Sequence, residues 1–450
     1  MNTNRKLFLL LFLGIQIGTA QTPALEQTFD TLVNPLYEEN GPGLVVLVAK
    51  EDVIHYRKAF GMADLELQVP MRTDHVFEIG SMTKQFTAVC LLMLKEQGKL
   101  TLDDTIGMYL PDYPLAGRKV TLHQLLNHTS GIKSYTEMPG LNVFARQDKT
   151  PTELIDHFKN EPMDFEPGTQ WHYSNSGYVI LGFIIEKVSG MAYADFVRQH
   201  IFEPLGMHRS YYGSKTELIP NRASGYMPTK NGYRNADYLS MSLPYAAGSL
   251  MSCVDDMFLW FQAIRKNTLI TTESKALAFA DTVLPNGKST HYGYGWQRNE
   301  ILGTPTVEHG GGIFGYVAQG VYVPESEIYV VVLTNRNGNS PQNTAIRLAA
   351  HAMGTPFPKS GQGISLKKKQ LQRWTGTYVF DEGVPHTITM VDGSLYRTVE
   401  GEKPSPLFPI SQHEFYRKNT FDRYVFEKGD GVKTVRFSQR IVKKTGAVVN

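Results

Sequence analysis

The chain has 450 residues, of which 42% are hydrophobic and 20% are charged. This composition is that of a globular protein and excludes a disordered, collagen-like or coiled-coil chain. The 45 Lys and Arg against 43 Asp and Glu leave a net charge of +2, which gives no argument for a nucleic-acid partner. Two cysteines exclude a disulfide scaffold and a metal site built from several cysteines. At about 150 residues per domain, the length predicts about three domains.

The first 20 residues have the pattern of a secretory signal peptide. Arg5 and Lys6 precede the apolar run 7–13, and a small-residue triplet follows at 18–20. The apolar run is too short to span a bilayer. The pattern therefore predicts cleavage after Ala20, with an N-terminal membrane anchor as the alternative. No later apolar run is long enough for a membrane span, so we expect a secreted or periplasmic protein without an integral membrane segment.

Charge is distributed unevenly along the rest of the chain. Residues 365–450 hold 15 Lys and Arg against 9 Asp and Glu, a net charge of +6. Residues 21–364 hold 28 against 34, a net charge of −6. This asymmetry indicates two separately folded parts. We expect the basic tail to present a solvated face, with contact to acidic polymers of the cell wall or envelope as the alternative.

In chain order, the hydrophobic pattern predicts strands near both ends of the first 355 residues and helices between them. The expected elements are an amphipathic helix at 24–39, a strand hairpin at 43–50 and 53–61, a helix at 82–95, a mostly helical stretch at about 100–290, strands at 306–308, 316–323 and 328–333, and a helix at 344–353. This order predicts an α/β (α+β) fold. In this fold, helices flank one antiparallel sheet, whose strands come from both ends of the first 355 residues. A mostly helical domain is inserted between these strands.

The tail has a different pattern, with short strands and the hairpin signals Asp392-Gly393 and 429–431. It predicts a small all-β accessory domain. The expected domains are a signal peptide at 1–20, a main domain at 21–355 with its insertion at about 100–290, a linker at 356–366 and the all-β domain at 367–450.

Residues 81–84 (SMTK) form an S-x-x-K sequence between a strand signal and a strongly apolar helix. Residues three apart on a helix share one face, so the Lys84 ammonium can help to deprotonate Ser81 or stabilise its anion. A helix N-terminus also favours negative charge on the attacking oxygen. Two other matches begin at Ser130, in a Gly-containing turn, and at Ser365, at the edge of the linker. Their surroundings favour Ser81 as the reactive serine.

Two further elements carry chemistry. Residues 173–175 (YSN) place Tyr173 beside Asn175, and neighbouring cations lower a tyrosine pKa by favouring the phenolate. Asn175 can hold a substrate amide or the lysine. Residues 309–312 (HGGG) follow a strand signal, and a glycine-rich strand edge lets a substrate backbone approach closely. For His309 alone, a core or loop histidine is the alternative.

In the order S-x-x-K, Y-x-N and H-x-G, these elements resemble the serine β-lactamase/penicillin-binding-protein superfamily. Within it, they are most similar to the class C β-lactamase-related branch of esterases, D-amino-acid-specific peptidases and other hydrolases. The resemblance covers about residues 24–355 and includes the Leu-Leu-x-His-Thr-Ser-Gly run at 125–131. It implies Ser81 as the acylated nucleophile and Lys84 as its activator. Tyr173 is implied to relay the proton to the leaving group and later to activate the deacylating water.

The resemblance also implies the binding residues. Asn175, His309, Gly310 and Gly311 are expected to bind substrate. The backbone N–H groups of Ser81 and Gly312 are expected to form the oxyanion hole. We expect a small-molecule or peptide substrate. We expect neither a cofactor nor a metal, because the histidines lack metal-ligand spacing and no phosphate-binding glycine fingerprint follows a strand.

One position departs from the family pattern. His309 stands where penicillin-active members usually carry the lysine of K-T-G or K-S-G, and a histidine is largely neutral at pH 7. A literal K-T-G at 444–446 lies too close to the C-terminus to be followed by the strands and helix that the motif requires. Without the strand lysine, efficient β-lactamase and carboxypeptidase activity is disfavoured.

The sequence therefore predicts a secreted serine hydrolase that acts through a Ser81 acyl-enzyme on an ester, amide or peptide bond. An esterase, a D-amino-acid peptidase or amidase, and a weak β-lactamase all fit this description. The alternatives are a penicillin-binding or sensor-type protein that is acylated without turnover, and a D-Ala-D-Ala carboxypeptidase.

Overall fold

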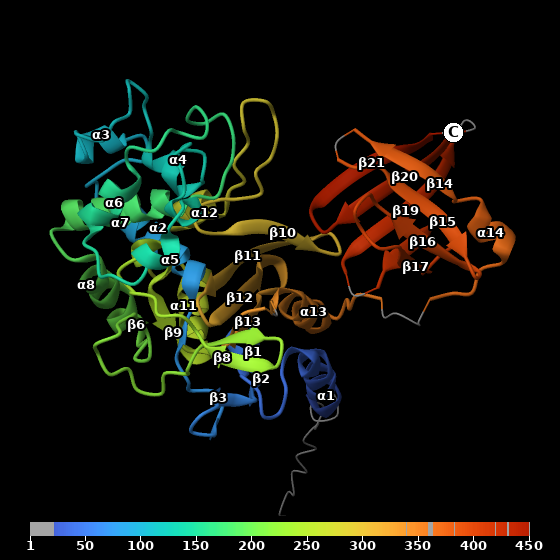
Figure 1. Ribbon diagram of the computed structural model, residues 1–450, viewed down its shortest axis with the longest axis horizontal. Coiled ribbons are helices and arrows are strands. Elements are labelled where there is room, and N and C mark those ends of the chain that lie inside the picture. The colour runs from blue at the N-terminus through green and yellow to red at the C-terminus, as the bar shows by residue number, and fades with distance from the viewer. Residues whose placement is uncertain are drawn as a thin grey trace, which may run out of the picture.

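The computed structural model shows a larger α/β body and a smaller β-barrel beside it (Figure 1). The residues that it describes are 22–338, 340–358, 363–381, 383–418, 420–429 and 432–449. The predicted signal peptide lies outside them. Among the described helices, none has the length and apolar character that a membrane span requires.

The body is built on one antiparallel sheet of six strands in the order β10-β11-β12-β13-β1-β2. The strands are β1 (Leu44–Lys50), β2 (Val53–Phe60), β10 (Gln297–Ile301), β11 (Thr304–Ile313), β12 (Tyr316–Val323) and β13 (Ile328–Thr334). β1 pairs with β13 so that Leu44 faces Thr334 and Lys50 faces Ile328. The sheet is thus closed by segments from both ends of the body, and the predicted fold class is confirmed.

Helices cover both faces of this sheet. On one face α1 (Thr22–Val33) and α13 (Gln342–Ala352) pack against alternate residues of the central strands, and on the other lie α2 (Thr83–Glu96) and α11 (Val254–Arg265). Because both faces are covered, β1 and β13 are almost continuously apolar. The first helix ends earlier than predicted, since Pro35 turns the next residues into a short 3-10 helix. The sequence does not predict β10, because its residues QRNEI carry a single strongly apolar side chain.

Between the first and last strands of the sheet, the chain forms short helices and small strands. The helices are α3 (Ile106–Tyr109), α4 (Leu122–Leu126), α5 (Leu141–Phe144), α6 (Pro151–Phe158), α7 (Asn175–Ser189), α8 (Tyr193–Val197), α9 (Glu203–Leu205), α10 (Tyr245–Gly248) and α12 (Thr272–Phe279). The strands are β3 (Met62–Asp64), β4 (Val69–Pro70), β5 (Phe77–Glu78), β6 (Tyr211–Tyr212), β7 (Tyr226–Thr229), β8 (Gly232–Asn235) and β9 (Leu250–Ser252). The buried helix α2 packs against α7, and the 3-10 turn at its N-terminal end (Gly80–Met82) contacts β11 and β12. The N-terminal end of α2 therefore lies between the sheet and the inserted helices.

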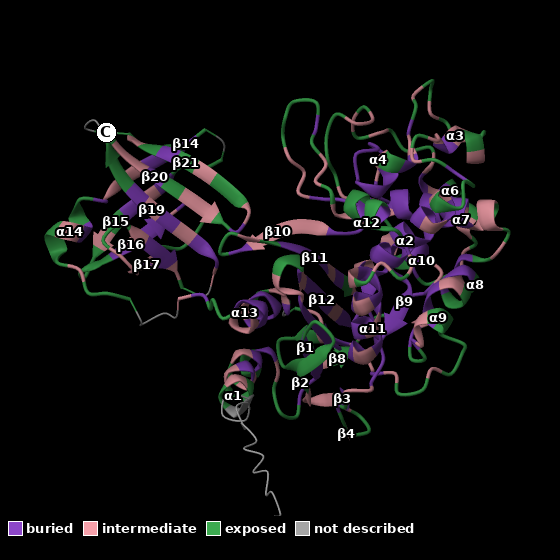
Figure 2. Ribbon diagram, turned by 180° about the vertical axis from the view of Figure 1, so that it is seen from behind, coloured by how far each residue is buried: buried purple, intermediate pink, exposed green. Residues whose placement is uncertain are grey.

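The tail forms a closed barrel of eight antiparallel strands, which confirms its predicted all-β character. A short helix, α14 (Lys368–Gln372), precedes it. The strands are β14 (Gly376–Phe380), β15 (His386–Val391), β16 (Ser394–Thr398), β17 (Ser405–Pro409), β18 (Glu414–Arg417), β19 (Asp422–Gly429), β20 (Val432–Gln439) and β21 (Val442–Val449). Aromatic side chains such as Trp374, Tyr424 and Phe426 fill the interior, and exposed residues alternate with buried ones along the strands (Figure 2). Closure removes the free strand edges that invite aggregation.

Candidate active site

Ser81 lies in a tight turn between β5 and α2. Gly80 and Met82 flank it in a 3-10 turn, and Gly80 adopts a left-handed φ of 51°. A Cβ atom on Gly80 would lie 2.9 Å from the backbone nitrogen of Gly312. A glycine is therefore required at position 80, because the turn packs directly against β11. As the sequence predicts, Ser81 is presented at the start of the buried helix.

Lys84 lies one helical turn further and is completely buried. Its Nζ atom is 3.3 Å from Oγ of Ser81 and donates hydrogen bonds to Oδ1 of Asn175 at 2.7 Å and to the carbonyl of Ala247 at 2.9 Å. Burial lowers the pKa of Lys84 well below its usual value. Burial therefore favours the neutral amine over the ammonium.

The Tyr173 hydroxyl is buried beside this group and makes no hydrogen bond of ordinary geometry to a described residue. Nζ of Lys84 lies 4.8 Å from the centre of its ring. Burial raises the pKa of Tyr173, and the nearby Ser81 hydroxyl offsets only part of that rise. The net direction is opposite to the lowering that neighbouring cations can produce, and Tyr173 remains a phenol at neutral pH.

His309 is buried on β11, and its imidazole is held by two hydrogen bonds. Its Nδ1 lies 2.6 Å from the carbonyl of Gly310, and Nε2 lies 2.8 Å from the Tyr292 hydroxyl. Since a carbonyl only accepts, Nδ1 carries the proton and Nε2 accepts from Tyr292. Burial, with a smaller effect of Lys84, lowers the pKa of His309 to about 3. His309 is therefore neutral, and the site has no counterpart of the strand lysine at this position.

The glycines beside His309 have different surroundings. A Cβ atom on Gly311 would lie 1.9 Å from the carbonyl oxygen of Ile79, and one on Gly310 would lie 2.9 Å from Oε1 of Gln319. The glycine at 311 is thus required by packing of β11 against the chain that leads into Ser81. This reason differs from the substrate approach that the sequence suggests.

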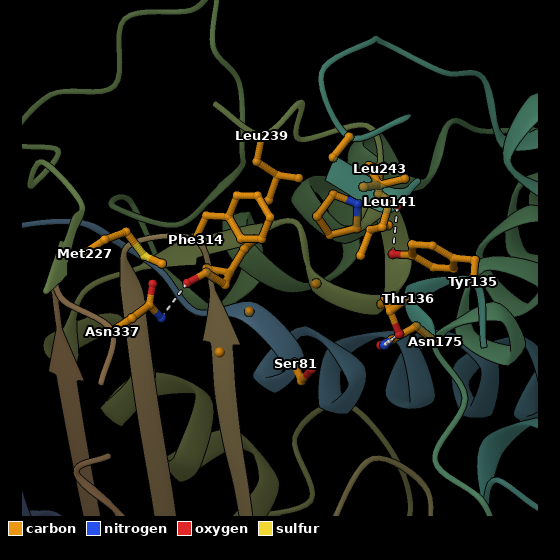
Figure 3. Close-up of a pocket in the computed structure, with 17 residues that line it drawn as sticks. Ser81, Tyr135, Thr136, Leu141, Asn175, Met227, Leu239, Leu243, Phe314 and Asn337 are labelled. Carbon is orange, nitrogen blue, oxygen red and sulfur yellow. Dashed lines mark hydrogen bonds between the residues drawn. The ribbon is translucent and has the colours of Figure 1, made fainter. Parts of the chain in front are cut away.

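A cavity of about 450 Å³ is lined by Ser81 and Gly312, and Figure 3 shows Ser81 below it. Of the residues expected to bind substrate, Asn175 lines it, whereas His309, Gly310 and Gly311 do not. The other side chains that line it are uncharged: Tyr135, Thr136, Leu141, Ala145, Met227, Leu239, Leu243, Pro244, Ala247, Ile313, Phe314 and Asn337. The sequence did not reveal most of this lining, because loops and short elements without periodicity supply it.

Asn175 links the cavity to Lys84. Its Oδ1 accepts from Lys84, and one hydrogen of Nδ2 is donated to Oγ1 of Thr136 at 3.0 Å (Figure 3). The amide has a second Nδ2 hydrogen, which can meet a substrate carbonyl. The sequence predicts that Asn175 holds a substrate amide or the lysine. This geometry allows the side chain to do both at the same time.

The competing motifs lie elsewhere. The Ser130 hydroxyl accepts a hydrogen bond from the Ile132 N–H inside a buried turn, and Ser365 is exposed before the barrel. The K-T-G at 444–446 is part of β21 in the barrel. None of them lines the cavity.

In the described part of the chain, one group of side chains is close enough to share a metal ion, formed by Glu137, Asp164 and His172. His172 contacts both carboxylates, and Lys133 pairs with Asp164. The members of the group therefore already contact one another or Lys133, and none of them lines the cavity.

Comparison with known proteins identifies the family. The Beta-lactamase family matches residues 25–353, and the chain belongs to this family. The chain is 32% identical over 414 residues to penicillin-binding protein 4* of Bacillus subtilis (strain 168), a match that covers 87% of this chain and 90% of that protein. It is 27% identical over 355 residues to a D-aminopeptidase of Gluconobacter oxydans (strain 621H), covering 77% of this chain and 66% of that protein.

Solved structures show the same relationship. The octameric penicillin-binding protein homologue from Pyrococcus abyssi is similar with a TM-score of 0.65 and 26% identity, over 94% of this chain and all of that one. A D-stereospecific amidohydrolase from Streptomyces sp. is similar with a TM-score of 0.63 and 26% identity, over 74% of this chain and 99% of that one. The protein is thus a serine hydrolase with the β-lactamase fold, and the resemblance expected from its motifs is confirmed.

Proposed function

We propose that the protein hydrolyses ester or amide bonds of uncharged substrates through an acyl-enzyme on Ser81. The observation that carries this proposal is the hydrogen bonding of Lys84. A neutral amine has two hydrogens and one lone pair, and the carbonyls of Asn175 and Ala247 accept from both hydrogens. The lone pair is left for the Ser81 hydroxyl, 3.3 Å away.

The proposed reaction starts with transfer of the Ser81 proton to Lys84 as Oγ attacks the substrate carbonyl. The oxygen of that carbonyl becomes negative and is stabilised by the N–H groups of Ser81 and Gly312, each worth roughly 3 kcal/mol of barrier. Both residues line the cavity at its base. The C–O or C–N bond to the leaving group then breaks and leaves the acyl group on Ser81.

Tyr173 would carry the proton from Lys84 to the leaving group. As a phenol it can donate its own proton to the departing oxygen or nitrogen while it accepts the proton held by Lys84. In the second half of the reaction, the same relay would run in reverse: a water molecule gives its proton to Tyr173 as it attacks the acyl carbonyl, Tyr173 passes a proton to Lys84, and Lys84 returns one to Oγ of Ser81 as the acyl group leaves. The Tyr173 hydroxyl supports this role, because it lies beside the Ser81 hydroxyl and makes no hydrogen bond of ordinary geometry to a described residue.

The cavity lining supports an uncharged acyl group. No lining residue is a Lys, Arg, Asp, Glu or His, and apolar side chains predominate. A free carboxylate would lose its hydration without a cation to receive it, and a free ammonium would lose it without a carboxylate. Neutral esters and N-blocked amides therefore fit better than D-Ala-D-Ala peptides or β-lactams. A D-amino-acid amide is the second candidate substrate, because similar proteins are named D-aminopeptidase and D-stereospecific amidohydrolase.

A hydrolysis panel tests the proposal: p-nitrophenyl butyrate, an N-acetylated and a free D-phenylalanine p-nitroanilide, nitrocefin and a D-Ala-D-Ala peptide. We expect the neutral ester and the blocked anilide to be turned over most efficiently, and the Ser81→Ala variant to be inactive on both. A stoichiometric burst without steady turnover would instead favour the sensor-type alternative. Release of D-alanine as the fastest reaction would favour the carboxypeptidase.

We further propose that the chain is secreted after cleavage at Ala20, and N-terminal sequencing of the protein from culture supernatant or periplasm tests this. Contact of the barrel with acidic wall polymers stays a prediction. Several barrel arginines already pair with barrel acids, among them Arg397 with Glu402 and Arg423 with Glu414. Binding of the full chain to purified peptidoglycan, with its salt dependence, would test the contact.

A further inference from the structure

The barrel reaches the sheet of the body through the hairpin of β20 and β21. Gln439 pairs with Val442, so Arg440 and Ile441 form a two-residue turn at its tip. Arg440 has a φ of 56°, a positive value that the first residue of a two-residue hairpin turn often takes, as Glu51 and Asp392 do in this chain. Its side chain points from this turn into the body.

Arg440 forms a buried, two-pronged ion pair with Glu308 of β11. Nη1 lies 2.9 Å from Oε2 and Nη2 contacts Oε1, while Nε donates to the carbonyl of Glu300 at 2.9 Å. The Arg440 side chain is 6% exposed and that of Glu308 is 0% exposed. In the described part of the chain, Glu308 has no other ion-pair partner. This buried carboxylate of β11, next to the edge strand β10, is therefore neutralised by the barrel.

The charge asymmetry of the sequence has a local counterpart here. Besides Arg440, the barrel residue Lys443 pairs with Glu300 of β10 at 2.9 Å, at a site where Lys443 is 63% exposed. Ile441 donates its N–H to Oδ1 of Asn299. Basic groups of the barrel thus meet acidic groups of the hydrolase body at β10 and β11. Figure 1 shows β10 extending toward the barrel.

Glu308 lies on the strand that supports the active site. It directly precedes His309, and Gly312 lies four residues further along β11, roughly 13 Å away at the rise of a strand. The same strand packs closely against the turn that holds Ser81. The space between Gly311 and the Ile79 carbonyl is too small for a side chain. A shift of β11 would therefore change the position of the Gly312 N–H relative to Ser81.

We propose that Arg440 is a positioning residue of the active site and that the barrel is a working part of the hydrolase. By neutralising Glu308, Arg440 holds β11 in the register that the oxyanion hole needs. A buried carboxylate without its cation is strongly unfavourable, so the strand would move to let water reach it. Oxyanion donors act over a narrow range of distance, and a small displacement is enough to slow the reaction. This inference rests on the proposed acyl-enzyme function.

The test compares Arg440→Met with Lys443→Met, a control that removes an exposed cation from the same interface. Steady-state kinetics on p-nitrophenyl butyrate are normalised to the active sites titrated with a fluorophosphonate, so that unfolded protein does not count. For Arg440→Met we expect kcat to fall about tenfold to a hundredfold and KM to change less than about twofold. For Lys443→Met we expect wild-type values.

A double variant separates positioning from a loss of packing. Arg440→Met with Glu308→Gln removes the unpaired charge, so we expect it to recover most of the kcat lost in Arg440→Met. An unchanged kcat in Arg440→Met, an equal loss in Lys443→Met, or a double variant as slow as Arg440→Met would each overturn the inference. Ser81→Ala tests the underlying function separately, because its turnover does not depend on whether Arg440 matters.

Discussion

The Tyr292 hydroxyl donates a hydrogen bond to Nε2 of His309 over 2.8 Å, and the imidazole is thereby fixed as a neutral acceptor. His309, which stands in place of the family's strand lysine, packs near Tyr173. The centres of the two rings are 6.3 Å apart. The cavity beside Ser81 is lined by uncharged side chains.

Tyr292→Phe removes this donor and leaves Nε2 of His309 buried without a partner. We expect the free energy of unfolding to fall by about 1–3 kcal/mol, the usual cost of an unsatisfied buried polar atom. KM for a neutral ester should change little, because neither residue lines the cavity. Urea denaturation together with steady-state kinetics measures both. A large rise in KM with unchanged stability would show that His309 meets the substrate.

The pH dependence of kcat/KM should follow Lys84. Its base form is the unprotonated amine, so activity should fall as the pH drops through the pKa of Lys84, which burial lowers well below the usual value. His309, with a pKa of about 3, stays neutral over the same range. We therefore expect His309→Asn to keep the midpoint of the acid limb, measured with a fluorophosphonate or ester. Loss of that limb in His309→Asn would assign it to the histidine.

Two neighbouring glycines offer a matched comparison of packing. In Gly311→Ala the new methyl would lie 1.9 Å from the Ile79 carbonyl, whereas in Gly312→Ala nothing lies within 4 Å of it. We expect Gly311→Ala to lose about 3 kcal/mol or more of stability through overpacking and to be nearly inactive. Gly312→Ala should unfold at the wild-type temperature. Equal melting temperatures for the two variants would contradict the close contact of β11 with the Ser81 turn.

A cation introduced into the cavity should change its preference. Met227 lines the cavity from β7, and Met227→Lys would offer a partner to a substrate carboxylate. We expect the kcat/KM ratio of p-nitrophenyl hemiglutarate to p-nitrophenyl butyrate to rise about threefold to tenfold. Added salt should reduce the gain. Met227→Gln is the uncharged control. A wild-type enzyme that already prefers the hemiglutarate would refute the uncharged-cavity argument.

Some contacts of the site follow from local geometry, whereas distant ones such as that of Lys84 with Asn175 are expected through the family resemblance. Ser81 and Lys84 are three residues apart on one helix, and their contact follows from helical spacing. The ion pair of Glu308 with Arg440 joins residues 132 positions apart and has no local signal. The raised pKa of Tyr173 likewise follows from its burial, which only tertiary packing determines.

In the fold, too, elements with a local sequence pattern are predicted and elements without one are not. Alternation and apolar runs predict the central strands and the all-β tail, because burial imposes those patterns. The edge strand β10 escapes prediction, since four of its five residues are only partly buried. The cavity lining also escapes it: Leu141, Leu243 and Phe314 come from separate segments without a shared period.

The central claim, acylation of Ser81, is tested most directly by rapid acid quench during turnover of p-nitrophenyl butyrate, followed by peptide mass spectrometry. We predict a butyryl adduct on Ser81 that forms and decays at rates consistent with kcat, and no adduct or turnover in Ser81→Ala. Steady turnover by Ser81→Ala, or an adduct on a different residue in the wild-type protein, would contradict the account.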